Sequence, residues 1–185
     1  MKYTYIIFAL TLLGIFGFKN HGSIYKSNTG NINFFSHTAV EDISADNHKV
    51  KTAFDANSGK IQFSALIKDF QFKKALMQEH FNENYMESTK FPKSTFSGTI
   101  VNIDAFNIEK NGTYTSPVSG KLTIKDVTKT VEALGTFIVK DGVINAKASF
   151  NVNPEDYNIS IPKMVSEKIS RDLKISVDVD YSHQH

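Results

Sequence analysis

Apolar and polar residues alternate along much of this chain, and a period of two is typical of β-strands with one buried face and one face in water. The alternation is regular over residues 61–68, 118–125, 144–152 and 172–179. A fifth segment, 130–140, is apolar on both faces in its second half, so we expect a helix or a second subunit to cover it. The pattern predicts a chain built mainly of strands.

Turn residues fall between these segments. Asp141-Gly142 separates two alternating runs and predicts a hairpin with a type I′ turn. Asn111-Gly112 is a second hairpin signal, residues 57–59 are a looser third, and Asp126 lies in a short turn. We count about eight strands, and eight strands joined by hairpins commonly close into a barrel that leaves no sheet edge exposed. The predicted fold class is therefore all-β, a single antiparallel barrel.

One segment, residues 72–88, departs from the alternation. Apolar residues recur there at helical spacing, among them Phe72, Phe81 and Tyr85, with Lys and Glu between them. A proline restricts the residue before it, so the helix should end ahead of Phe91-Pro92. We expect this helix to lie near one mouth of the barrel.

The N-terminus carries a separate apolar run. Lys2 precedes the run from Ile6 to Phe18, whose length suits the core of a signal peptide and is short for a membrane span. We interpret residues 1–22 as a signal peptide, which predicts a periplasmic or secreted protein. No A-x-A cleavage pattern follows the run, so an uncleaved anchor is the alternative. The barrel domain is then residues 23–182, and residues 183–185 form a frayed polar tail.

Composition narrows the functional classes. The chain has 185 residues and a formal charge of +2, which suits one domain with no strong field for nucleic acid. It has no Cys, which excludes thiol catalysis, disulfides, thiolate metal sites and an acylated lipoprotein anchor. The 15 Phe and the absence of Trp suit a β core alone or a cavity for an apolar molecule.

The sequence carries no motif for catalysis or metal binding. None of the six His pairs with another at metal-ligand spacing within an element. There is neither a serine-nucleophile elbow nor a Gly-rich phosphate loop. His80 lies near the apolar face of the predicted helix, where it either donates to a backbone carbonyl or contacts a ligand headgroup. We expect no enzyme activity, no metal and no cofactor.

Three segments, taken in order, resemble the YceI-like family. Residues 75–98 are similar to the family's helix, its exit through an aromatic-Pro pair, and a strand motif formed here by Phe96 and Gly98. Residues 120–131 (GKLTIKDVTKTV) are similar to its strand-turn-strand motif, and residues 148–159 (ASFNVNPEDYNI) to a late element with Asp-Tyr. The resemblance extends from Tyr25 to Asp180.

The resemblance implies a lipocalin-like antiparallel β-barrel with a helix near its opening, in a periplasmic or secreted protein. Family members with known ligands bind polyisoprenoid chains, such as isoprenoid quinones or polyprenyl phosphates, or fatty-acid amides, and several are dimers. This chain departs from the family at two places. Asp126 stands where the family turn has Gly, and residues 153–155 replace Asn-Arg-Ser/Thr, which removes an arginine expected near a headgroup.

These observations predict non-catalytic binding, with carriage or sequestration, of a long apolar ligand in the cell envelope. We expect headgroup or mouth contacts from His80, Tyr85 and Tyr157, and we expect transient membrane contact and a homodimer as further partners. The alternative is a structural or interaction protein, because the side chains of eight strands can fill a barrel completely. Alternation and the resemblance together place these residues on the lumen lining: Phe34, Phe63, Ile67, Phe96, Ile100, Leu122, Ile124, Phe137 and Phe150.

Overall fold

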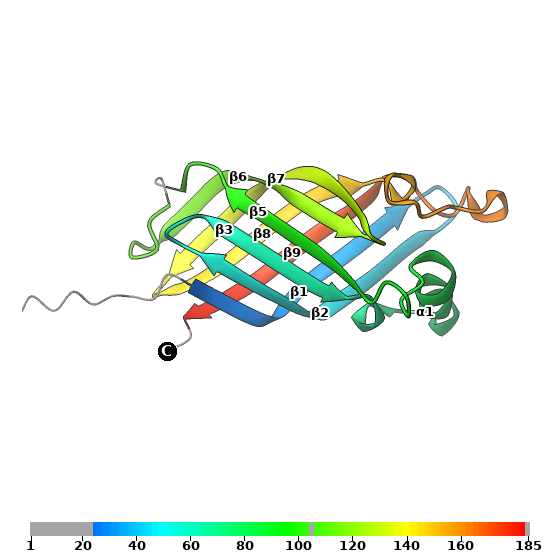
Figure 1. The fold of residues 1–185 in the computed structure, drawn as a ribbon, viewed down its shortest axis with the longest axis horizontal. Coiled ribbons are helices and arrows are strands. Elements are labelled where there is room, and N and C mark those ends of the chain that lie inside the picture. The colour runs from blue at the N-terminus through cyan, green and yellow to red at the C-terminus, as the bar shows by residue number, and fades with distance from the viewer. Residues whose placement is uncertain (1–23, 104–105, 184–185) are drawn as a thin grey trace, which may run out of the picture.

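The computed structural model describes residues 24–103 and 106–183, and most of them lie in strands (Figure 1). The strands are β1 (Ile24–His37), β2 (Asp42–Asp55), β3 (Lys60–Leu66), β4 (Gln71–Phe72), β5 (Lys93–Ile100), β6 (Gly112–Ile124), β7 (Val127–Lys140), β8 (Val143–Val152) and β9 (Leu173–His183). The helical elements are the α-helix α1 (Ala75–His80), the π-helix η2 (Phe81–Tyr85) and the 3₁₀ turns η1 (Ile67–Asp69), η4 (Pro154–Tyr157) and η5 (Lys163–Val165). None of the described helices is both long enough and apolar enough to span a bilayer.

Eight of the strands form a closed antiparallel barrel, as predicted. Each pairs with the next in the order β1, β2, β3, β5, β6, β7, β8, β9, and β9 pairs with β1 again. The two-residue strand β4 adds only a short pairing to β2. Closure satisfies the backbone groups that an open sheet would leave unpaired at its edges.

The turns explain where the chain reverses. Asp141 and Gly142 both have positive φ, 50° and 81°, and join β7 to β8 in the predicted two-residue turn. Lys125 and Asp126 also have positive φ, 47° and 60°, and join β6 to β7 in the same way without a glycine. Gly59, with φ of 70°, closes the turn between β2 and β3.

The hairpin predicted at Asn111-Gly112 is wrong. Strand β5 ends at Ile100 and β6 begins at Gly112, so the connection is the longer loop 101–111. The Asn111 side chain instead supports the neighbouring β7–β8 turn: its Nδ2 donates to Asp141 Oδ1 at 3.0 Å, and its Oδ1 accepts from the Asp141 N–H at 2.8 Å. The Asn-Gly pair is common in turns because the Asn side chain readily forms hydrogen bonds with nearby backbone. Here the backbone group bonded by Asn111 belongs to Asp141, in the β7–β8 turn.

The helix is shorter than residues 72–88. Helical backbone runs from Ala75 through Tyr85, first as α1 and then as η2. Phe72 lies in β4 and pairs with Ala45 of β2, so a tertiary pairing takes this residue out of the helix. The prediction that the helix ends before Phe91-Pro92 is confirmed.

The barrel has two different ends (Figure 1). At one end, the mouth end, lie α1, η2, the β1–β2 turn and the long loop 153–172. The other end, the closed end, carries the β2–β3 and β7–β8 turns, the loop 101–111 and the last residues of β9. Strand β9 extends to His183, which pairs with Tyr25, so the polar tail does not begin at residue 183 as predicted. Residues 1–22, interpreted as a signal peptide, lie outside the described residues.

The closed half of the barrel is filled by side chains. Phe54, Phe137 and Tyr181 meet across the lumen. The centroid of the Phe54 ring lies 6.2 Å from that of Phe137 and 6.0 Å from that of Tyr181. The Tyr181 hydroxyl is fully buried and forms a hydrogen bond with Thr52 Oγ1 at 2.6 Å. On the outside of β7, Leu134 is 61 % exposed, so the helix does not cover this face, and the prediction of a covering helix is wrong.

Candidate functional site

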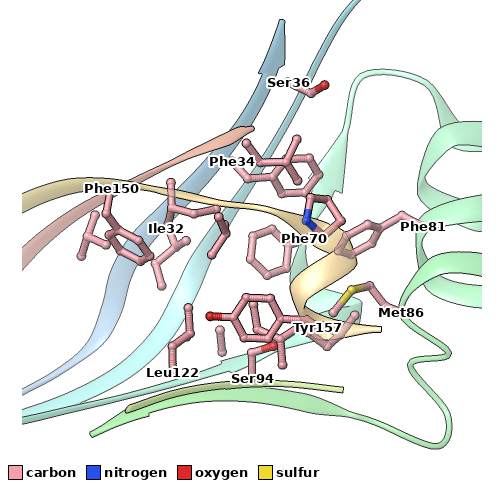
Figure 2. A pocket seen from close by; sticks show the side chains of 18 of the residues that line it. Ile32, Phe34, Ser36, Phe70, Phe81, Met86, Ser94, Leu122, Phe150 and Tyr157 are labelled. Atoms are coloured by element: carbon pink, nitrogen blue, oxygen red, sulfur yellow. The ribbon is translucent and has the colours of Figure 1, made fainter. Parts of the chain in front are cut away.

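The mouth half of the barrel contains a cavity of about 560 Å³. Its wall is built from inward-facing residues of the barrel strands, and α1, η2, η4 and the loop 161–169 surround its opening. Figure 2 shows this wall with Phe81 of η2 and Tyr157 of η4 beside it. All eight barrel strands contribute to the wall, and because inward residues alternate with outward ones, the inner face can be almost wholly apolar. Members of this wall include Ile32, Phe63, Ala65, Leu122, Val131, Ala148, Phe150, Ile175 and Val177.

Small residues keep this half of the barrel open. Ala133 and Gly135 on β7 and Ala146 and Ala148 on β8 all line the cavity. Larger side chains at these inward positions would meet across the lumen, since a barrel of eight strands is narrow enough to be filled.

Glycines on the wall let one ring lie flat against it. Gly98 of β5 faces Gly120 of β6, and the Phe96 ring lies over both. A methyl group placed on Gly98 would come within 2.5 Å of Phe96 Cζ, and one on Gly120 within 2.6 Å of the same atom. The ring therefore occupies the space that two Cβ atoms would fill, and the centre of the lumen stays free.

Four phenylalanines hold the helix over one side of the mouth. Phe34 of β1 packs against Phe70 at 5.9 Å, Phe72 at 5.5 Å and Phe81 at 5.5 Å between ring centroids. Phe81, at the start of η2, also lies 5.0 Å from Phe72. These four rings pack the helical segment against the strands and form an aromatic border on one side of the mouth (Figure 2).

Tyr157 brings the main polar group into the cavity. The residue is 2 % exposed, and its hydroxyl points toward Leu122 and away from Met86 (Figure 2). No residue within 24–103 or 106–183 forms a hydrogen bond with this hydroxyl. Burial raises the pKa of Tyr157, and the Asp156 carboxylate raises that pKa further, so the hydroxyl is protonated and can donate to a ligand oxygen.

Charged side chains border the mouth of the cavity, whereas the wall inside the barrel is apolar. Lys74 Nζ lies 2.8 Å from Glu41 Oε1, and both residues border the cavity together with Lys168 and His80. The hydrogen bond from Lys74 lowers the pKa of Glu41, and the charges of Lys74 and Lys168 act in the same direction. Tyr85 also borders the cavity, and burial raises the pKa of its hydroxyl. Among the described residues, no three acidic or His side chains come together as a metal site.

A family model for the YceI-like domain matches residues 18–181 of this sequence. The chain belongs to the YceI-like family. This confirms the family indicated by the helix, the strand-turn-strand motif and the Asp-Tyr element. Among proteins with curated descriptions, none matches the sequence significantly.

Solved structures share the YceI-like barrel. A polyisoprenoid-binding domain from Saccharophagus degradans aligns with a TM-score of 0.77 at 11 % identity, over 88 % of this chain and 99 % of that one. Burkholderia cenocepacia BcnA aligns with a TM-score of 0.69 at 15 % identity, over 83 % and 96 %. The YceI protein of Campylobacter jejuni aligns with a TM-score of 0.56 at 16 % identity, over 100 % and 92 %. At these identities the likeness shows the fold alone.

The YceI-like barrel brings most of the predicted lining residues together. Phe34, Phe63, Ile67, Phe96, Leu122, Ile124, Phe137 and Phe150 border the cavity, and so do His80, Tyr85 and Tyr157. Ile100 does not border it: this residue is 2 % exposed and packs in the core of the closed half. Alternation correctly places Ile100 on the inner face of β5, but it does not tell how far along the barrel the cavity extends. A role in ligand binding stays a prediction for all of these residues.

Two groups of lining residues were missed from the sequence. Ala146 and Ala148 belong to the alternating run 144–152, and Ala133 lies in the segment 130–140; small residues on an inward face are the signal that could have identified them. The loop 153–172 contributes apolar residues such as Ile159 and Ile169. The loop has no periodicity, so apart from Tyr157, which the resemblance indicates, its sequence does not show which of its residues face the barrel.

Proposed function

We propose that this protein binds one long apolar molecule in the barrel and carries or sequesters it in the cell envelope. The observation that supports this proposal is the cavity itself: about 560 Å³ of apolar space, inside a closed barrel, open at the mouth end. A volume of this size falls within the range of about 300–1,000 Å³ typical of small-molecule sites. No chemistry is required of the wall for such a function.

The driving force is the removal of hydrocarbon from water. Each buried CH₂ contributes roughly 0.8 kcal/mol, so ten buried carbons contribute about 8 kcal/mol before ordering costs are subtracted. The Phe-rich wall suits a flexible chain, because rings present flat surfaces along which a chain can lie.

The ligand's polar group belongs near Tyr157 or at the rim. The Tyr157 hydroxyl faces the cavity without an acceptor among the described residues, and a carbonyl, hydroxyl or phosphate oxygen of a ligand would satisfy it. Lys74, Lys168 and His80 lie farther out, where an ionised headgroup could stay in water. A ligand bound in this way would have its hydrocarbon chain inside the barrel and its polar end toward the mouth.

The comparisons support the ligand class and the sequence supports the location. The Saccharophagus degradans domain with the same barrel is described as polyisoprenoid binding, and we extend an isoprenoid, quinone or fatty-acyl ligand to this chain. The apolar run Ile6 to Phe18 supports export from the cytoplasm.

The experiment is extraction of protein purified from its own envelope, followed by mass spectrometry of the organic phase. We expect one or a few chain-bearing lipids, in amounts near one per barrel. Ala148→Phe would fill the cavity and should lose the lipid, whereas Ser149→Phe, on the outer face of the same strand, should keep it. An extract without any lipid, from protein whose melting temperature also does not respond to added farnesol or oleic acid, would refute the proposal.

A further inference from the structure

The cavity has a floor toward the closed end of the barrel, where Phe137 lies near the end of β7. Phe137 borders the cavity on one side and is only 2 % exposed. On its other side the Phe137 ring packs against Phe54 at 6.2 Å and Phe106 at 5.3 Å between centroids. Phe106 comes from the loop 101–111 at the closed end, so a loop side chain helps to block the barrel from below.

The residues beneath the floor leave no passage to the closed end. Phe106 packs edge-on against Tyr114 at 5.2 Å, and Phe54 packs against Tyr181 at 6.0 Å. Inward residues of this half are almost fully buried and none of those that follow borders the cavity: Tyr25, Phe54, Ile100, Val139, Ile144, Val179 and Tyr181. The barrel is therefore open at one end and plugged at the other.

The volume above the floor sets a capacity. An apolar protein cavity of roughly 150 Å³ accommodates one benzene molecule, which corresponds to about 25 Å³ per carbon atom. At that density 560 Å³ accommodates about 20 carbon atoms.

We propose that the floor formed by Phe137 limits the bound chain to about 20 carbon atoms, or four isoprene units, and that any further length stays outside the mouth. This proposal rests on the proposed function and narrows its ligand class. The preferred ligands are then diterpenoid or long fatty-acyl molecules, because carbons beyond the limit remain in water and add no affinity.

The test is a series of isoprenols with two, three, four and nine isoprene units: geraniol, farnesol, geranylgeraniol and solanesol. Their affinities are measured by competition against a fluorescent fatty-acid probe at a fixed low detergent concentration. We expect affinity to rise about tenfold or more for each unit up to geranylgeraniol, and solanesol to bind within about threefold of geranylgeraniol. A further rise of more than tenfold from geranylgeraniol to solanesol would overturn the proposal.

A variant that raises the floor provides the second test. Ala146 lines the cavity and pairs with Phe137 in the β7–β8 register, so Ala146→Leu adds volume directly at the floor. The affinity should then stop rising at farnesol. Ala53→Leu makes the same change on the outer face of β2 and should leave the limit at geranylgeraniol. A limit unchanged in Ala146→Leu would overturn the role of the floor.

The two proposals fail in different ways. If no isoprenol and no fatty acid displaces the probe, the carrier function itself is refuted and the limit with it. If all of them bind with affinities that keep rising with length, the carrier function stands and only the limit is refuted.

Discussion

Replacing Gly98 by alanine tests how the wall of the cavity is built. A methyl group at this position would lie 2.5 Å from Phe96 Cζ and 2.6 Å from the backbone oxygen of Ser119. The ring can rotate, but the Ser119 oxygen moves only if strand β6 moves. Overpacking of this kind typically costs about 1–3 kcal/mol.

An opposing effect has to be subtracted. Replacing glycine by alanine reduces the conformational freedom of the unfolded chain and stabilises a protein by roughly 0.4–1 kcal/mol where the native backbone allows it. The steric cost is larger, so Gly98→Ala should destabilise the barrel by about 1–2 kcal/mol net. For a domain of this size each kcal/mol lowers the melting temperature by about 2–4 °C, so the expected fall is roughly 2–8 °C.

The assay is thermal unfolding followed by circular dichroism, with a matched glycine as control. Gly112 lies at the start of β6, and a methyl group there would meet nothing closer than the Tyr114 ring at 3.5 Å. Gly112→Ala should therefore leave the melting temperature unchanged or raise it by about 1–3 °C. Adding Phe96→Leu to Gly98→Ala should recover part of the loss, because it removes the ring atom at 2.5 Å but not the Ser119 contact. A Gly98→Ala variant as stable as the original would show that the ring does not occupy this space.

Three further predictions concern the turn, an ion pair and the buried hydroxyl pair. Asp126→Gly should raise the free energy of unfolding by about 1 kcal/mol, measured in urea, because Asp126 has φ of 60° and glycine adopts that conformation without a steric cost. Lys125 Nζ lies 2.5 Å from Glu87 Oε1, and its hydrogen bond and charge lower the pKa of the Glu87 carboxyl. The pair therefore stabilises the fold at neutral pH and loses that contribution as the pH falls through the lowered pKa, so Glu87→Gln should flatten the acid side of the pH dependence of the melting temperature. Thr52→Val should cost about 1–3 kcal/mol by leaving the Tyr181 hydroxyl without a partner, and the double variant with Tyr181→Phe should be more stable than Thr52→Val alone.

The predictable parts of this protein are those set by neighbours in sequence. Alternation correctly predicts β3, β6, β8 and β9, because successive side chains in a strand point to opposite faces whatever the strand pairs with. Asp141-Gly142 identified its turn because the backbone there needs positive φ at two successive residues. Asn111-Gly112 is a turn signal of the same kind, yet the Asn111 side chain bonds to another loop, and local sequence does not show that difference.

The sequence predicts which residues of the candidate site point into the barrel, but not how far along the barrel the cavity extends. The alternation and the resemblance place Phe34, Phe63 and Phe96 inside the barrel, and they border the cavity. The same reasoning includes Ile100, which lies instead in the filled half. Only the barrel determines which inward residues share a level, because strands far apart in sequence meet there with a tilt and stagger that no single strand specifies.

Local sequence specifies four of the strands, three of the four predicted turns and the apolar character of the inner face, and its motifs indicate the family. Packing between distant strands is what plugs one end of the barrel and leaves the other open. That outcome depends on which side chains face each other across the lumen: Phe54, Phe106 and Phe137 meet at the closed end, whereas Ala133, Ala146 and Ala148 leave space at the mouth end. Such contacts join residues from different strands, so they follow from packing in three dimensions and not from the order of residues along the chain.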